Sequence, residues 1–257
     1  MYKRQLLDSK DEVIKEFGEY VYDKVFVHYT AKQWNIPIEQ VDTSVINRVP
    51  VILGYDDRYF QDKYQFMPKN GYNEIFENML SHKNIDIELQ KDAKDLLEIK
   101  NNKIYVDGLE YKGEVIYSGA LDELLSYQYG ALPYRSLNLE FTDYKENYYQ
   151  PSSVVNYPND EKFTRITEFK YLSNQIVKDN TTILREYPLT YDYKNSKHIP
   201  YYAILNDENK KLYEKYYSLV KDIKNFHLCG RLAEYKYYNM DAVIKRALEL
   251  YREIKGE

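Results

Sequence analysis

The chain has 257 residues, of which 44% are hydrophobic and 30% are charged, so it can form a folded core. Its net charge of −5 argues against a nucleic-acid binder, and no apolar run reaches the ~20 residues of a transmembrane helix, so we expect a cytoplasmic protein. Cys229 is the only cysteine and the four histidines lack ligand spacing, which argues against a disulfide framework and a metal centre.

Helical spacing dominates the first third of the chain. Apolar residues recur every three or four positions from Asp11 to about His28 and again from Asn73 to His82, which predicts two helices. The stretch from Ile46 to Tyr72 carries Pro50 and Gly54 and is predicted to be a mobile loop between strands. Trp34, the only tryptophan, could stack on a ring ligand or belong to the core.

Strand patterns dominate the middle of the chain. Ile85–Leu89 alternates strictly, which predicts a half-exposed strand. Further strands are predicted over 103–108 and 112–119, with Asp107-Gly108 as a turn. From Tyr134 to about Leu189, β-branched and aromatic runs separated by turns indicate an antiparallel meander.

The last part returns to helices. An amphipathic helix is predicted from Asp207 to about Ile223, then a short strand from Phe226 to Gly230. A final helix begins near Val243, with Asn239 or Asp241 as its cap. A glycine turn before a helix, next to Arg231, is either an anion site or an ordinary β–α turn with a surface arginine.

Tyrosine is unusually frequent, with 31 residues against 9 phenylalanines. Phenols can line sugar and phosphate sites because they combine an apolar face with a hydroxyl group. The alternative, which we prefer for most of them, is that tyrosine replaces phenylalanine at half-buried positions.

Several sequence motifs are specific enough to be compared with a known family. The stretch from Gly230 to Met240 closely resembles the C-terminal signature of UDP-galactopyranose mutases. Tyr29–Asn35 resembles the Gly-Tyr-Thr-x-Lys-Gln-Trp-Gly element of that family, and Phe163–Lys170 resembles its Tyr-Thr-Arg-Ile element. Glu186-Tyr187-Pro188 and Pro200-Tyr201-Tyr202 match two further segments, so the resemblance covers about residues 11–257.

The resemblance implies roles for individual residues. It implies two catalytic arginines, Arg165 and Arg231. It implies substrate-binding roles for Tyr29, Trp34, Tyr64, Arg165, Tyr202 and Tyr237, and cofactor-binding roles for Arg231, Asn239 and Met240. The chain departs from the family at Asn239, where aspartate is usual, and at Ile52, where the family has a substrate-clamping arginine that Arg48 and Arg58 do not obviously replace.

By resemblance, the function is that of a flavin-dependent isomerase of cell-envelope polysaccharide biosynthesis. It would interconvert UDP-galactopyranose and UDP-galactofuranose with reduced FAD, through a flavin N5–sugar adduct. Two alternatives stay open, an inactive nucleotide-sugar-binding homologue and another flavin oxidoreductase on the same fold. The expected partner is UDP-galactose, with no nucleic acid.

The resemblance also implies an α/β fold in three parts. They are a helical segment over 1–47, an antiparallel β-sheet substrate domain over 48–66 and 131–222, and a remnant of a Rossmann-like flavin-binding domain over 67–130 and 223–257. The family begins with a strand, a Gly-x-Gly-x-x-Gly turn and a helix, and the nine glycines here do not supply that turn. We therefore expect the C-terminal two-thirds of a mutase, either truncated or completed by a partner chain, with a homodimer as a further alternative.

Overall fold

The structure is a computed structural model that describes residues 2–35, 37, 55, 58 and 62–257. Its residues cluster into two compact units. The first unit consists of Met1–Ile87 and Leu137–Leu189, and the second of Glu88–Ser136 and Thr190–Glu257. Helices, antiparallel sheets and one parallel strand pair give a mixed α/β fold. The three-part division expected from the sequence stays a proposal.

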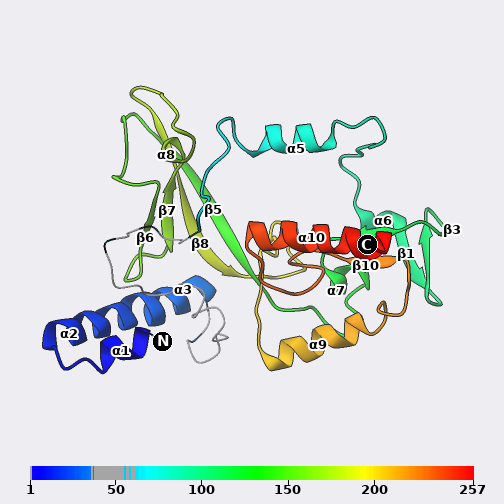
Figure 1. The fold of residues 1–257 in the computed structure, drawn as a ribbon, viewed down its shortest axis with the longest axis horizontal. Coiled ribbons are helices and arrows are strands. Elements are labelled where there is room, and N and C mark those ends of the chain that lie inside the picture. Colours follow the sequence, from blue (N-terminus) through cyan, green and yellow to red (C-terminus); the bar gives the residue numbers. More distant parts are fainter. Residues whose placement is uncertain (1, 36, 38–54, 56–57, 59–61) are drawn as a thin grey trace. The chain divides into compact units, whose positions relative to one another are not determined.

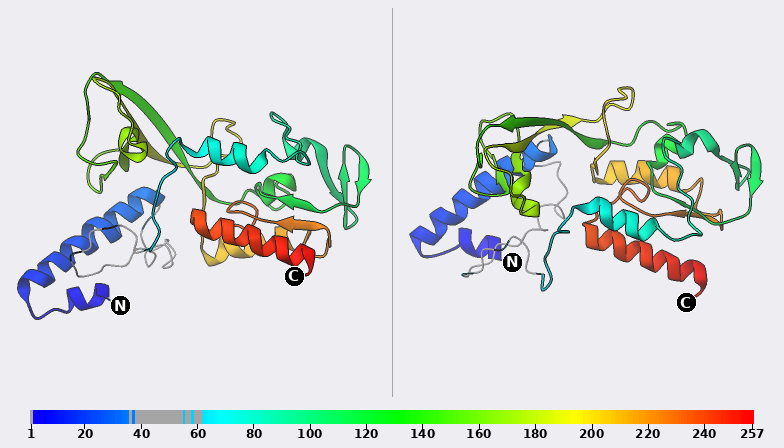
Figure 2. Two further views of the ribbon diagram at one scale, coloured as in Figure 1. Left: turned by 45° about the horizontal axis from the view of Figure 1, so that its top comes forward. Right: turned by 90° about the horizontal axis from the view of Figure 1, so that it is seen from above.

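The two helices predicted in the first unit are present. The run from Asp11 to about His28 forms α2 (Glu12–Val21) and η1 (Tyr22–Tyr29), and the run from Asn73 forms α5 (Tyr72–Leu80), whereas α1 (Tyr2–Leu7) and α3 (Thr30–Trp34) were not predicted. The carboxylate of Asp11 caps α2 by accepting from the N–H groups of Val13 and Ile14 at 3.0 and 3.2 Å. The helices α1 and α2 lie side by side (Figures 1 and 2). Gly18 permits this approach, because a Cβ there would lie 2.8 Å from the Cβ of Leu6.

The segment η1 is a π-helix, so the run predicted from Asp11 to His28 is helical throughout but changes its hydrogen bonding at Tyr22. Such segments are rare and frequent at functional sites. The helix α3 ends at Asn35, which adopts a left-handed conformation with φ of 53°.

The predicted meander is a five-stranded sheet in the order β6-β7-β8-β5-β9. Its strands are β5 (Tyr134–Tyr144), β6 (Val154–Asn156), β7 (Arg165–Glu168), β8 (Thr181–Thr190) and β9 (Tyr202–Ala203). The helix α8 (Phe169–Ser173) follows β7 directly. The pairs β6/β7, β7/β8 and β5/β9 are antiparallel, as the turn signals predict.

The second unit contains two small sheets and four helices. The strands β1 (Leu97–Lys100), β2 (Lys103–Val106) and β3 (Leu109–Tyr111) form an antiparallel meander, and β4 (Val115–Tyr117) pairs in parallel with β10 (Phe226–Leu228). The helices are α6 (Ala93–Leu96), α7 (Leu121–Leu124), α9 (Asp207–Tyr217) and α10 (Met240–Lys255). Figures 1 and 2 show α9 and α10 flanking β10.

Tyrosines build much of the core of the second unit. Tyr134 and Tyr216 are almost fully buried, and the rings of Tyr134 and Tyr235 meet edge to face with centroids 5.4 Å apart. The hydroxyl of Tyr216 donates to the carbonyl of Gly130 at 2.7 Å, and that of Tyr235 donates to the carbonyl of Pro133 at 2.6 Å. The hydroxyl of Tyr134 donates instead to Oδ1 of Asp122 at 3.4 Å. These three tyrosines are core residues, more fully buried than the half-buried positions expected from the composition.

One predicted element is wrong. Ile85–Leu89 is irregular, although its sequence alternates as strictly as any strand in the chain. Ile85, Ile87 and Leu89 are 41%, 55% and 81% exposed, so the alternating face has nothing to cover it among the described residues. Alternation favours a strand only where a neighbouring strand supplies hydrogen bonds and a core accepts the apolar face.

Candidate functional site

Three polar residues form a row across the strands β6, β7 and β8 of the first unit. Asn156 on β6 lies opposite Arg165 on β7, and Arg165 lies opposite Glu186 on β8. Residues directly opposite on neighbouring strands point to the same face, so the three side chains share one face of the sheet. Only Arg165 was singled out from the sequence for a functional role.

Arg165 is held by Glu186. Its Nε donates to Oε1 of Glu186 at 2.6 Å, and the arginine side chain is 32% exposed while Glu186 is 5% exposed. The backbone carbonyl of Glu186 accepts from the amide of buried Thr164 at 2.8 Å and from its hydroxyl at 3.1 Å. Oε2 of Glu186 is buried without a hydrogen-bond partner among the described residues, so the nearby guanidinium is its main compensation.

The π-helix joins the same row. The hydroxyl of Tyr29 donates to Oδ1 of Asn156 at 2.9 Å. Lys32, one turn later, donates to the carbonyl of Tyr157 at 2.6 Å, and burial lowers the pKa of its ammonium group. Two of the residues expected at the site, Tyr29 and Arg165, are thereby linked through Asn156.

The other two expected residues of this unit are placed differently. Trp34 is buried, with 5% exposed, and lies at the end of α3. Tyr64 is 74% exposed, with Nζ of Lys63 5.2 Å from its ring centroid. Neither position tests the substrate-binding role that the resemblance gives them, so both roles stay predictions.

The second unit contains a cluster of two tyrosines and two arginines. The rings of Tyr202, on β9, and Tyr237, after β10, stack with centroids 5.4 Å apart and planes inclined by 21°. The guanidinium carbon of Arg231 lies 5.2 Å from the ring centroid of Tyr202 and 5.3 Å from that of Tyr237. Arg135, on β5, lies 5.1 Å from the ring centroid of Tyr202. The structure thus brings together Tyr202, Arg231 and Tyr237, all expected at the site, and adds Arg135.

In the glycine turn after β10, the carboxylate of Glu234 accepts a hydrogen bond from the backbone. Gly230 has φ of 120°, which favours glycine, and its N–H donates to Oε2 of Glu234 at 3.1 Å. Oε1 of Glu234 accepts from Nε of Arg246 on α10 at 3.1 Å. The carboxylate of Glu234 therefore occupies the N–H that an anion bound at this turn would use.

The helix α10 begins at Met240, ten residues after that glycine. Asn239 occupies the N-cap position, as one of the two predicted caps, but its side chain makes no capping hydrogen bond. Met240 is 55% exposed. The expected cofactor-binding residues Asn239 and Met240 therefore lie at the start of a 16-residue helix rather than in the turn itself.

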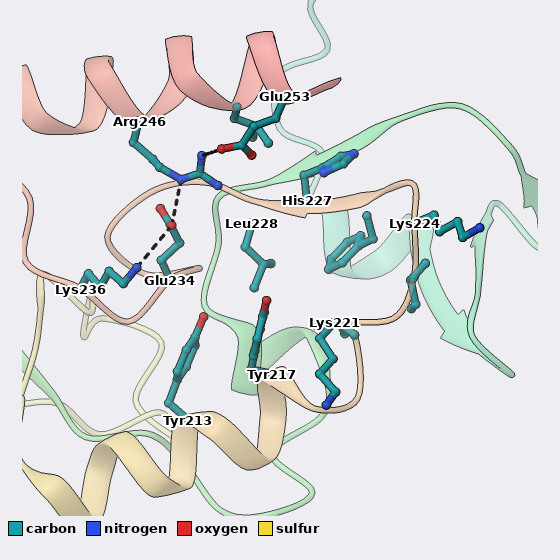
Figure 3. A pocket seen from close by; sticks show the side chains of 14 residues that line it. Tyr213, Tyr217, Lys221, Lys224, His227, Leu228, Glu234, Lys236, Arg246 and Glu253 are labelled. Carbon is teal, nitrogen blue, oxygen red and sulfur yellow. Dashed lines mark hydrogen bonds and ion pairs between the residues drawn. The ribbon is translucent and has the colours of Figure 1, made fainter. Parts of the chain in front are cut away.

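A cavity of about 460 Å³ lies between α9, β10 and α10 in the second unit (Figure 3). Tyr213 and Tyr217 line it from α9, and the ion pairs of Arg246 with Glu234 and Glu253 line it from the side of α10. None of the residues expected to bind substrate or cofactor lines it. The cavity is therefore not the predicted site.

Three residues of these clusters carried no predicted role. Arg135 stands in the alternating strand after Tyr134, where periodicity treats it as a surface residue, yet it is 3% exposed. Glu186 belongs to a quoted motif, and Asn156 to a predicted strand. A charged or amide side chain inside a strand pattern is the sequence signal that these residues share. That signal identifies a site only when the pairing of the strands is known.

Ile52 and Arg48 lie outside the described residues, and Arg58 is exposed. Within the part of the chain that the structure describes, no helix is long and apolar enough to cross a membrane. Over the same residues, no cluster of three histidine, cysteine, aspartate or glutamate side chains could hold a metal ion.

The model of one protein family, UDP-galactopyranose mutase, matches residues 24–237. The chain belongs to the UDP-galactopyranose mutase family. The matched range contains both polar clusters, including Tyr29, Arg165, Tyr202, Arg231 and Tyr237, and ends before Asn239 and Met240.

Curated mutases agree with this membership. The chain is 34% identical over 244 residues to the dTDP-fucopyranose mutase of Escherichia coli, covering 93% of this chain and 62% of that protein. It is 37% identical over 241 residues to a Klebsiella pneumoniae protein named "Probable UDP-galactopyranose mutase", covering 93% and 59%. It is 33% identical over 254 residues to the UDP-galactopyranose mutase of Mycoplasma genitalium, covering 97% and 62%. The chain thus spans about three-fifths of the length of these mutases.

Proposed function

We propose that this chain acts in the interconversion of UDP-galactopyranose and UDP-galactofuranose, as an isomerase. The observation that carries the proposal is the cluster of Arg231, Tyr202 and Tyr237. The family resemblance implies that these residues bind the substrate and the cofactor. They belong to separate segments of the chain, yet they lie within stacking distance of one another.

Each cluster has the chemistry that a nucleoside diphosphate sugar requires. Guanidinium groups pair with phosphate oxygens through charge-assisted hydrogen bonds, and phenol hydroxyls donate to the same oxygens. In the second unit, Arg231 and the two tyrosines would bind the diphosphate. In the first unit, Arg165 would do so while Tyr29 and Trp34 would contact the uridine or the sugar, and exposed Tyr64 would add a hydroxyl.

The two arginines would also contribute to the rate. Departure of UDP from the anomeric carbon adds negative charge to the diphosphate. A fixed positive charge therefore stabilises this state more than the ground state, in which the bond to the sugar is intact. The pairing of Arg165 with buried Glu186 restricts where this guanidinium can lie. Positioned charges of this kind lower the barrier without reorganising when the bond breaks.

A flavin fits part of what this chain offers. The parallel pair of β4 and β10 with α10 supports the proposal that 67–130 and 223–257 are part of a Rossmann-like flavin-binding domain. The positive end of the α10 helix dipole suits a polar acceptor, whereas the N–H of Gly230 is already bonded to Glu234. Arg231, Asn239 and Met240 would therefore hold one edge of FAD. When bound and reduced, FAD would supply the nucleophile for the anomeric carbon.

The test combines binding with turnover. Calorimetric titration of UDP into the chain should give saturable binding that weakens about tenfold or more in Arg231→Met, because one charge-assisted contact is lost. Conversion of UDP-galactofuranose to UDP-galactopyranose with reduced FAD, followed by chromatography, measures the reaction itself. The exposed Lys145→Met variant, which also loses one positive charge, is the control and should bind normally.

Each failure has a distinct meaning. Absence of UDP binding by the parent chain would refute the proposed function. Binding without turnover under reducing conditions would favour the inactive nucleotide-sugar-binding homologue. Net oxidation or reduction of a substrate would instead favour another flavin oxidoreductase.

A second substrate follows from one relative. The 34% identical protein of Escherichia coli is named a dTDP-fucopyranose mutase, so a thymidine nucleotide is an alternative to uridine for this chain. Parallel titrations with UDP and dTDP, in the same buffer and salt, decide between the two. Tighter binding of dTDP would replace UDP-galactose by a dTDP sugar while keeping the reaction class.

A further inference from the structure

A buried arginine lies against the tyrosine cluster of the second unit. Arg135 is 3% exposed and lies directly opposite Tyr202 in the register of β5 and β9. The backbone around this pair is fixed, because the amide of Tyr201 donates to the carbonyl of Arg135 at 3.0 Å and that of Ile204 donates to the carbonyl of Pro133 at 3.1 Å. The position of Arg135 under Tyr202 is therefore set by strand pairing and not by a flexible side chain alone.

Burial of this charge is unfavourable unless something compensates for it. A guanidinium group keeps its proton at any physiological pH, so Arg135 cannot relieve the cost of burial by becoming neutral. Its guanidinium carbon lies 5.1 Å from the ring centroid of Tyr202, within the range of a cation–π interaction. A Phe or Leu at this buried position would avoid the desolvation cost altogether.

A second cation lies against the same ring. Arg231 is 5.2 Å from the ring centroid of Tyr202, so one phenol ring lies near two guanidinium groups. Two like charges at one ring raise the local positive potential, which disfavours the empty cluster and favours a bound anion. Of the two arginines only Arg231 is partly exposed, and Tyr202 and Tyr237 are partly exposed as well.

We propose that Arg135 is a positioning residue for diphosphate binding, acting through the ring of Tyr202. Its buried charge fixes the orientation of that ring, and with it the Tyr202 hydroxyl, and adds to the positive potential at Arg231. Arg135 itself does not touch the ligand. This proposal rests on the proposed function, since the ligand is the diphosphate of a nucleotide sugar.

The experiment is a double-mutant cycle read by calorimetric titration with UDP. Arg135→Met should weaken UDP binding about threefold to thirtyfold, the range of a desolvated cation–π contact. Arg135→Lys, which keeps the charge without the planar group, should weaken it less and so partly restore binding. In a Tyr202→Leu background, Arg135→Met should weaken UDP binding by a smaller factor than in the parent, because the ring that it orients is gone and only its contribution to the positive potential remains.

The control separates positioning from stability. Lys94 belongs to the same unit, and its ammonium group pairs with the carboxylates of Asp92 and Glu123. Lys94→Met removes one positive charge and some stability but should leave UDP affinity unchanged. An equal effect of Arg135→Met with and without Tyr202, or no effect at all, would overturn the proposal while UDP binding by the parent keeps the proposed function. If the parent does not bind UDP, the proposed function fails and this inference with it.

Discussion

Removal of Arg165 should destabilise the first unit as well as weaken ligand binding. Arg165→Met leaves the carboxylate of Glu186 buried, with Oε1 stripped of its 2.6 Å partner and Oε2 already lacking one among the described residues. Breaking a fully buried ion pair by removing one partner costs roughly 3–5 kcal/mol. Because the arginine side chain is 32% exposed, water compensates in part, and we expect a loss of about 2–3 kcal/mol in the free energy of unfolding.

A second substitution, at Glu186, tests whether the lost stability comes from the unpaired buried carboxylate. Glu186→Gln removes the buried negative charge, so Arg165→Met/Glu186→Gln should be more stable than the sum of the two single losses by about 1 kcal/mol or more. Urea titration followed by the fluorescence of Trp34, the only tryptophan and a buried residue of the first unit, measures each variant.

A matched pair on the surface serves as the control. Lys15 and Glu19, on α2 of the first unit, are 4.0 Å apart, and their side chains are 53% and 60% exposed. Lys15→Met should therefore cost less than about 0.5 kcal/mol. The reasoning is refuted if Arg165→Met costs no more than this control, or if the two substitutions at Arg165 and Glu186 are simply additive.

Three further predictions concern the second unit. Burial raises the pKa of the Asp122 carboxyl to about 6, so the folded chain binds this proton more tightly than the unfolded chain, and the free energy of unfolding should fall by up to about 3 kcal/mol as pH rises from about 4 to about 6. Asp122→Asn should flatten that fall in urea titrations across this range, and an unchanged slope would contradict it. Tyr216→Phe should cost about 1–3 kcal/mol, because the carbonyl of Gly130 and the amide of Tyr129 both lose their hydrogen-bond partner; a cost within about 0.5 kcal/mol in the same assay would show that water replaces the hydroxyl. Burial also raises the pKa of the Cys229 thiol, so a thiol reagent at pH 8 should react with the folded chain at least about tenfold more slowly than with the urea-unfolded chain, and equal rates would place Cys229 at the surface.

Local chemistry was enough to predict most of the elements. The helices α2, α5 and α10 and the strands β5 and β8 lie where apolar periodicity puts them, within a few residues, whereas α9 ends at Tyr217, about six residues before the predicted end at Ile223. Helices depend on contacts three or four residues apart, and the Asp107-Gly108 turn depends on two residues that adopt φ of 50° and 77°. These features need no knowledge of the rest of the molecule.

The family could also be identified from the sequence, because its motifs are continuous stretches such as Gly230–Met240. The same stretches named Arg165, Tyr202, Arg231 and Tyr237 as candidate site residues. Their roles remain proposals, since a motif identifies a residue without showing what it contacts.

Tertiary structure decided which residues face one another. Asn156, Arg165 and Glu186 form one row only because β6, β7 and β8 pair in one register, and a shift by a single residue would turn Arg165 to the opposite face. The pairing of Arg135 with Tyr202 joins positions 67 residues apart, far beyond any local period. The alternating segment Ile85–Leu89 is irregular, because a strand pattern forms a strand only when a neighbouring strand pairs with it. The sequence by itself determined the elements and the family, whereas long-range strand pairing decided burial, partners and the composition of each cluster.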